Sequence, residues 1–167
     1  MNPLRMNIRL GVLAGLGALL LAAFPALGQF NKDFDDCVYY QASGLPQVIP
    51  DDQVTTLVHE MTIAEDFLIA DINVRVSITY PWIADIDLFL ESPAGTLVEL
   101  ATDVGNDGDN FSDTVFDSNA ALGIASGSAP FTGCFRPEGD LSVLAGESAQ
   151  GVWKLRVYDR YSGDTGY

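Results

Sequence analysis

The stretch Asp-Ile-Asp-Leu-Phe-Leu-Glu-Ser-Pro-Ala-Gly-Thr, residues 85–96, decides the fold class of this chain. Leu88 and Leu90 fall on one face of an extended strand, while Asp87, Phe89 and Glu91 fall on the other. Residues 92–95 supply turn chemistry, because proline presets φ and glycine accepts a positive φ. The stretch therefore predicts a β-hairpin over residues 85–100.

Further short stretches outside this hairpin have strand character. They are residues 54–61, 67–80, 110–116, 131–137 and 151–159, with one helical turn expected at 141–147. The clearest is 67–80, in which Ile72, Val74, Val76 and Ile78 share one face. No long stretch with helical periodicity follows residue 28. Short strands separated by turn signals predict an all-β sandwich or barrel.

The N-terminal 28 residues have the pattern of a secretory signal peptide. Arg5 and Arg9 precede an uncharged apolar run over residues 10–24, and Ala-Leu-Gly at 26–28 fits a signal-peptidase site. The run is shorter than the roughly 20 apolar residues that span a membrane. We expect residues 1–28 to be removed, and the remaining chain to be a secreted, extracellular single domain with no membrane association.

The chain is strongly acidic, with 23 Asp and Glu residues against 8 Lys and Arg and a net charge of −15. This balance argues against nucleic acid and against anionic membrane surfaces as partners. It favours divalent cations.

Nucleophilic catalysis is poorly supported by the sequence. His59 is the only histidine, and there is no Gly-x-Ser-x-Gly nucleophile motif. A single histidine in a strand pattern is expected to be a surface or packing residue. Zinc lacks ligands at suitable spacing. We therefore expect no enzymatic activity from this chain by itself.

The two cysteines, Cys37 and Cys134, are a candidate disulfide. An isolated pair in an exported protein usually forms a disulfide, although two free buried thiols are the alternative. A disulfide would attach the N-terminal segment to the body of the domain.

Acidic residues are concentrated at the start of the hairpin and in the loop that follows it. The candidate calcium ligands are Asp85, Asp87, Asp103, Asp107, Asp109, Asp113 and Asp117. Carboxylate oxygens suit calcium. An EF-hand does not fit, since Gly105 falls at a ligand position and Thr114 stands where the bidentate glutamate belongs. The sequence thus leaves open an irregular calcium site or a solvated acidic surface.

Taken in order, the motifs form a distinctive set. They are Ile-Pro-Asp-Asp at 49–52, the aliphatic alternation at 72–78, Asp-Leu-Phe-Leu-Glu-Ser-Pro-Ala-Gly-Thr at 87–96, Asn-Phe-Ser-Asp-Thr-Val-Phe-Asp at 110–117, Ser-Ala-Pro-Phe-Thr-Gly at 128–133, Arg-Pro-Glu-Gly at 136–139, the segment 141–146, Gly-Val-Trp-Lys-Leu-Arg-Val-Tyr-Asp at 151–159 and Gly-Asp-Thr-Gly at 163–166. The set resembles the P domain, or P/Homo B domain, of subtilisin-like proprotein convertases and related bacterial secreted serine proteases. The resemblance covers residues 49–167, after an extended lead-in at 29–48.

The resemblance implies a jelly-roll-like antiparallel β-sandwich. It also implies a non-catalytic accessory module that packs on a subtilisin-like catalytic domain and stabilises it, and calcium binding is found among such domains. The alternative is a stand-alone extracellular binding or adhesion module for carbohydrate or for another extracellular protein.

Two features depart from the family pattern. The domain follows the leader almost directly, and the chain stops at Tyr167, before the final strand that the family has. We therefore expect a C-terminally truncated domain with an open sheet edge, in which Trp153, Leu155 and Val157 are less well covered.

Overall fold

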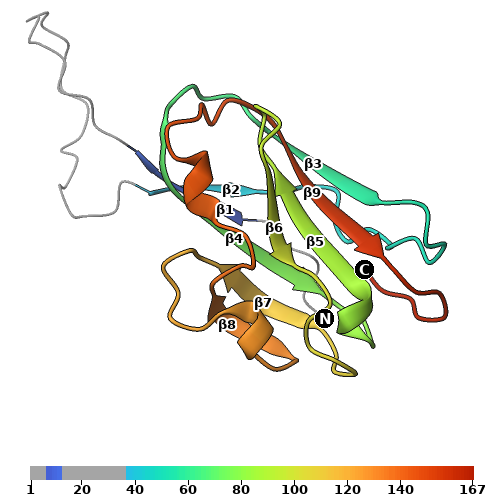
Figure 1. Cartoon of the computed structure of the whole chain (residues 1–167). Helices are drawn as coiled ribbons and strands as arrows, with labels where there is room; N and C mark the ends of the chain where they lie inside the picture. The colour runs from blue at the N-terminus through green and yellow to red at the C-terminus, as the bar shows by residue number, and fades with distance from the viewer. Residues whose placement is uncertain (1–6, 13–36) are drawn as a thin grey trace, which may run out of the picture.

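The computed structural model describes residues 7–12 and 37–167 (Figure 1). This described part contains nine β-strands and three short 3-10 helices. The strands are β1 Asn7–Val12, β2 Cys37–Gln41, β3 Leu57–Ile63, β4 Ile69–Ile78, β5 Ile86–Glu91, β6 Leu97–Ala101, β7 Phe111–Phe116, β8 Phe131–Phe135 and β9 Gly151–Asp159. The 3-10 helices are η1 Ile83–Asp85, η2 Ile124–Ser126 and η3 Leu141–Leu144.

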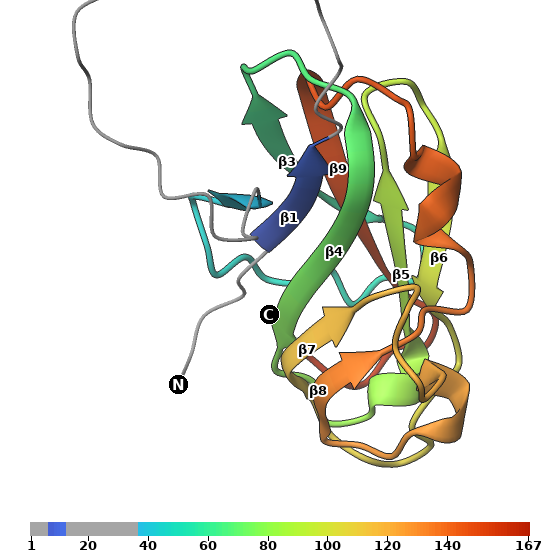
Figure 2. The same cartoon turned by 90° about the vertical axis from the view of Figure 1, so that its left-hand side faces the viewer.

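The strands form two sheets that face each other (Figures 1 and 2). One sheet has the order β2-β1-β4-β7-β8 and the other has the order β3-β9-β5-β6. All pairs are antiparallel except β7 with β8, which run parallel. The predicted all-β sandwich is confirmed. The described part of the chain contains no helix with the length and apolarity needed to cross a membrane.

The core lies between the sheets and follows the alternation read from the sequence. Ile72, Val74, Val76 and Ile78 of β4 are all buried, as predicted. Opposite them, the inward residues of β5 and β9 complete one continuous apolar layer. Burial of alternate residues fixes the register, because a shift of one residue would turn each apolar side chain outward.

Strand β9 is in the interior of its sheet, between β3 and β5. Trp153, Leu155 and Val157 are therefore no more than 1% exposed. The expectation that these three residues are poorly covered is wrong, because neighbours on both sides pair with β9 along its length.

The C-terminal residues lie beside the end of β4. Thr79 and Tyr167 exchange two backbone hydrogen bonds, of 2.8 and 3.0 Å. Gly166 packs directly on Thr79 and Tyr80, so closely that a Cβ there would overlap the Thr79 carbonyl oxygen.

The two cysteines are in strands at opposite edges of one sheet. Cys37 opens β2, and Cys134 in β8 is an exposed free thiol. Neighbouring strands lie about 4.8 Å apart, so four steps separate β2 from β8 by roughly 19 Å. A disulfide requires Cα atoms about 4.4–6.8 Å apart. The predicted disulfide is thus not formed in the structure, whose strand order places the two residues too far apart.

Part of the predicted signal peptide is within the sheet. Asn7–Val12 forms β1 and pairs with both β2 and β4. The remainder of the predicted signal peptide, residues 1–6 and 13–28, lies outside the described residues, as do residues 29–36 of the predicted lead-in.

Candidate functional site

The acidic residues at the start of β5 lie close to the loop that follows β6. Asp87 is buried, at 8% exposure, and its Oδ1 atom has no hydrogen-bond partner. Its Oδ2 atom lies 3.3 Å from Nε of Arg160. Burial raises the pKa of Asp87; Arg160 opposes this rise, and repulsion from Glu99 and Asp103 adds to it. The backbone N–H of Asp103 lowers the pKa again, so Asp87 is a buried carboxylate that Arg160 and the Asp103 backbone partly stabilise.

Asp85, at the end of η1, belongs to a neighbouring group of carboxylates. Its pKa is raised by burial first, and then by repulsion from Asp159, Asp164 and Asp103. The negative charge of Asp103 raises the pKa of both Asp85 and Asp87, so Asp103 lies near each of them. These three predicted residues, Asp85, Asp87 and Asp103, are the ones that the fold brings together.

Two carboxylates of this group, Asp159 and Asp164, were not among the site residues predicted from the sequence. Asp159, the last residue of β9, is 1% exposed and accepts a hydrogen bond of 2.8 Å from the Tyr80 hydroxyl. The same hydroxyl lies 3.2 Å from the carbonyl oxygen of Asp164. Burial, followed by the hydrogen bond and the charge of Asp159, raises the pKa of Tyr80. The available signal was weak: Tyr80 and Asp159 each end a predicted strand.

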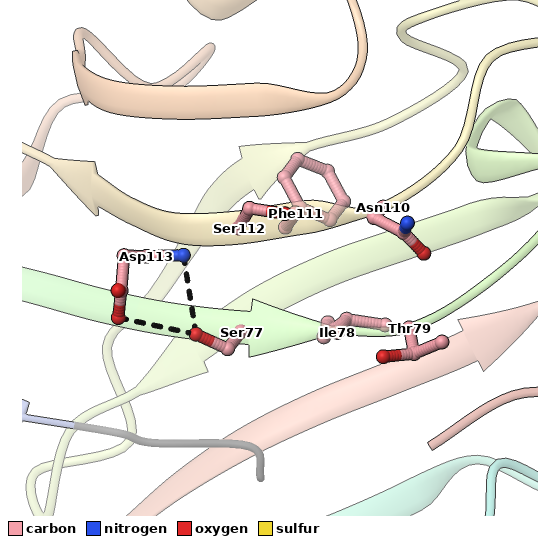
Figure 3. Close-up of a pocket in the computed structure, with 7 residues that line it drawn as sticks. All are labelled: Ser77, Ile78, Thr79, Asn110, Phe111, Ser112 and Asp113. Atoms are coloured by element: carbon pink, nitrogen blue, oxygen red, sulfur yellow. Dashed lines mark hydrogen bonds between the residues drawn. The ribbon is translucent and has the colours of Figure 1, made fainter. Parts of the chain in front are cut away.

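Asp113 is separate from this group, on β7 (Figure 3). It has a positive φ of 51°, and its backbone N–H donates to Ser77 Oγ over 3.1 Å. The Ser77 hydroxyl in turn lies 3.4 Å from Asp113 Oδ1. Ser77 and Asp113 line a pocket of about 360 Å³ with Asn110. Asp113 thus supports the irregular pairing of β4 with β7.

The remaining predicted ligands have other surroundings. Asp117 Oδ1 accepts the Asn119 N–H over 2.7 Å and stabilises a turn, while Asp107 and Asp109 are exposed in the loop between β6 and β7. In residues 7–12 and 37–167, no group of three or more histidine, cysteine or acidic side chains is placed to hold a metal ion. The seven residues do not form one ready-made site.

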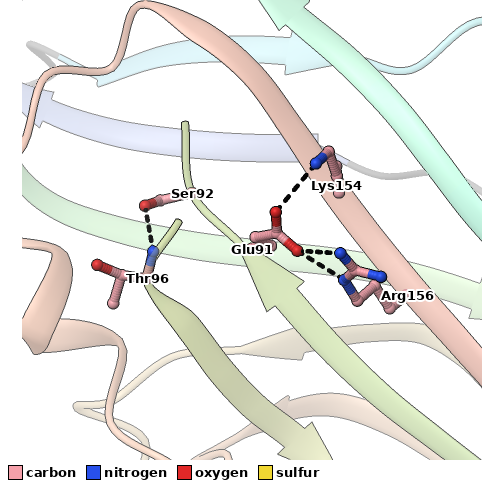
Figure 4. Close-up of polar contacts among 5 residues, drawn as sticks. All are labelled: Glu91, Ser92, Thr96, Lys154 and Arg156. Carbon is pink, nitrogen blue, oxygen red and sulfur yellow. Dashed lines mark hydrogen bonds and ion pairs between the residues drawn. The ribbon is translucent and has the colours of Figure 1, made fainter. Parts of the chain in front are cut away.

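The Ser-Pro-Ala-Gly-Thr turn of the hairpin serves the fold. The Ser92 hydroxyl donates to Glu147 Oε2 over 2.6 Å, and the Thr96 hydroxyl donates to Oε1 of the same carboxylate. The Thr96 N–H also donates to Ser92 Oγ over 3.2 Å (Figure 4). This turn therefore fastens the β5–β6 hairpin to the segment that leads into β9.

The outer face of the β3-β9-β5-β6 sheet carries an ion-pair group and a groove. The Glu91 carboxylate pairs with Nζ of Lys154 at 3.0 Å (Figure 4). It also accepts hydrogen bonds from Nε of Arg156, at 2.6 Å, and from Nη2 of the same residue. Hydrogen bonds from Lys154 and then Arg156 lower the pKa of Glu91. The groove has a volume of about 580 Å³ and includes Phe89, Leu97 and Tyr158.

His59 has no catalytic surroundings. It is 4% exposed on the inward face of β3, and its Nδ1 atom lies 3.2 Å from Gln47 Oε1. Its Nε2 atom has no partner. The ring therefore contacts neither a nucleophile nor an acid through a hydrogen bond among the described residues.

A sequence model of the proprotein convertase P-domain family matches residues 69–167. The matched region begins at β4 and includes the hairpin, the acidic residues above and β9. Neither a curated protein nor a solved structure matches the chain. Because the family match covers more than half of its length, the chain belongs to the proprotein convertase P-domain family.

Proposed function

We propose that this protein is a secreted, non-catalytic P-domain module that serves a subtilisin-like serine protease as its accessory, stabilising domain. The observation that carries the proposal is the family match over residues 69–167. The surroundings of His59 support the non-catalytic part, because among the described residues no hydroxyl, thiol or carboxylate is hydrogen-bonded to its ring, as the base of a triad requires.

A peptidase assay tests the non-catalytic part directly. The purified chain should not cleave casein or small amide substrates. Cleavage that disappears on His59→Ala or on substitution of a serine would contradict it.

We also propose that calcium binds beside Asp87, near Asp85 and Asp103, although in the described part of the chain these three side chains do not converge as a ready-made metal site. Support comes from the buried Oδ1 of Asp87, which has no side-chain partner, and from burial and neighbouring carboxylates, which raise the pKa of both Asp85 and Asp87. A divalent cation would relieve this repulsion, and oxygen ligands suit calcium. Backbone carbonyls and water would have to complete the coordination, since calcium takes six to eight oxygens.

Thermal unfolding with calcium and with EGTA, at matched ionic strength, measures this binding. Calcium at a hundredfold excess over Kd should stabilise the fold by about 2.7 kcal/mol. Asp87→Asn should abolish the rise in melting temperature, whereas Asp109→Asn, in the exposed loop, should retain it. Equal melting temperatures for the unsubstituted chain in calcium and EGTA would refute the site.

A stand-alone binding module is the second candidate. The groove on the outer sheet face favours it, because Phe89 and Tyr158 offer ring surface beside the fixed charges of Glu91 and Arg156. Retardation of the protein in gels that contain soluble polysaccharide, lost on Phe89→Ala, would support this second function.

A further inference from the structure

Residues 45–51, between β2 and β3, form a strap that is fixed to the sandwich at three points. Gln47 lies against His59, as described above. The Ile49 N–H donates to the Gly166 carbonyl oxygen over 2.9 Å. Asp51 Oδ1 accepts the Gly163 N–H over 3.0 Å. The strap therefore joins β3 to the C-terminal segment, residues 163–167.

The first of these contacts, between Gln47 and His59, fixes which ring nitrogen carries the proton. Because Gln47 Oε1 can only accept, Nδ1 of the ring carries the proton that makes the 3.2 Å hydrogen bond. Nε2 then holds a lone pair, and it is buried without a partner. A second proton on the ring would sit on Nε2, where the described residues provide no acceptor.

In the part of the chain that the structure describes, no charged side chain compensates for a positive ring. Glu60 follows His59 on β3 and is exposed on the opposite face. Across the strand pair, His59 faces Leu155, whose neighbours Lys154 and Arg156 bind Glu91 on the outer face. In the strap, Asp51 accepts a hydrogen bond from Gly163, and directly after the strap Asp52 accepts hydrogen bonds from Thr55. Burial alone lowers the pKa of His59.

We propose that His59 is an acid-sensitive latch, which holds residues 45–51 against the sandwich while its ring is neutral and releases them when the ring takes up a second proton. Release also removes the hydrogen bonds that Ile49 and Asp51 make to Gly166 and Gly163, while the pairing of Tyr167 with Thr79 remains. A fall in pH should favour release of the strap, and a rise in pH should favour the strapped state. The strapped state resists protonation, so opening becomes more favourable as pH falls below the ordinary histidine pKa of about 6.5. The equilibrium constant for opening then rises about tenfold for each unit by which the pH falls, until the pH reaches the lower pKa of the strapped state.

The single histidine makes the test specific, because the ring signals in a proton NMR spectrum belong to one residue. In the unsubstituted full chain, the ring should titrate with a midpoint below about 6.5. Gln47→Glu places a carboxylate at Nδ1, and so it should raise this midpoint. Gln150→Glu is the matched control, because it adds the same charge at an exposed position and should leave the midpoint unchanged.

Hydrogen exchange at the Ile49 amide reports release of the strap. After correction for the intrinsic rate, exchange should accelerate between pH 7 and pH 5 in the unsubstituted chain. In His59→Leu, which keeps an apolar group between Leu57 and Met61, this acceleration should be absent. A histidine that titrates near 6.5, a midpoint that Gln47→Glu does not raise, or an Ile49 response that persists in His59→Leu would each overturn the latch.

Discussion

At the scale of single residues, the most informative groups in this domain are carboxylates whose surroundings differ sharply. Glu91 is stabilised as an anion by Lys154 and Arg156. Asp85 and Asp87 are destabilised as anions by burial and by neighbouring acids. The same functional group thus supports the fold on one sheet face and, at the end of the sandwich, carries the calcium binding that we propose.

Glu91 leads to a pH-dependent prediction. Its pKa in the folded state lies below that of an unfolded chain, so its carboxylate stabilises the fold above the ordinary glutamate pKa of about 4.3. This stabilisation is lost as pH falls through the lower folded-state pKa. Glu91→Gln should therefore lower the melting temperature at pH 7, and the difference from the unsubstituted chain should shrink toward pH 3.

The matched control for this experiment is Glu60→Gln, an exposed position on the same face of the sheet. Its melting temperature should follow that of the unsubstituted chain across the pH range. A constant difference between Glu91→Gln and the unsubstituted chain at all pH values would show that the ion pairs with Lys154 and Arg156 contribute nothing.

At the scale of elements, the strands from β3 to β9 followed from the sequence, whereas β1, β2 and the arrangement of the strands did not. The alternation over 151–159 predicted β9 with its observed limits, Gly151–Asp159, because burial of every second residue leaves a local pattern. Strand order leaves no such pattern. The sequence therefore did not reveal that β9 is central, that β7 and β8 are parallel, or that Asn7–Val12 pairs with β4.

The residues of the candidate site could likewise be predicted only in part from the sequence. Asp85, Asp87 and Asp103 could be selected from the sequence, since they flank one hairpin. Asp159 and Asp164 reach the same end of the sandwich from the far end of β9, and only tertiary pairing brings them there. Similarly, the Ser-Pro-Ala-Gly-Thr turn was visible, but its partner Glu147 is 51 residues from Thr96.

The C-terminal segment depends on one glycine, which gives a prediction at this scale. A Cβ at Gly166 would overlap the Thr79 carbonyl oxygen and the Tyr80 ring. Gly166→Ala should therefore destabilise the fold by about 1–3 kcal/mol, as overpacking does. Urea unfolding measures the loss. Gly123→Ala is the control, because its Cβ would meet only an ordinary contact with Arg136; equal stability of the two variants would contradict close packing at Gly166.

At the scale of the whole molecule, the domain is a sandwich in which the strap, residues 45–51, is hydrogen-bonded to the C-terminal segment, residues 163–167. Ile49 and Asp51 bond to Gly166 and Gly163, and Tyr167 pairs with Thr79. The family match supports the accessory role that we propose for this domain.

The most direct test of this account is the stability of a subtilisin-type catalytic domain from the same organism, measured alone and fused upstream of residue 49. The account predicts that the fusion raises the melting temperature of the catalytic domain and extends the half-life of its peptidase activity. The Gly166→Ala fusion, which weakens the module without touching the protease, should give a smaller gain. An unchanged melting temperature and half-life in the intact fusion would contradict the accessory function.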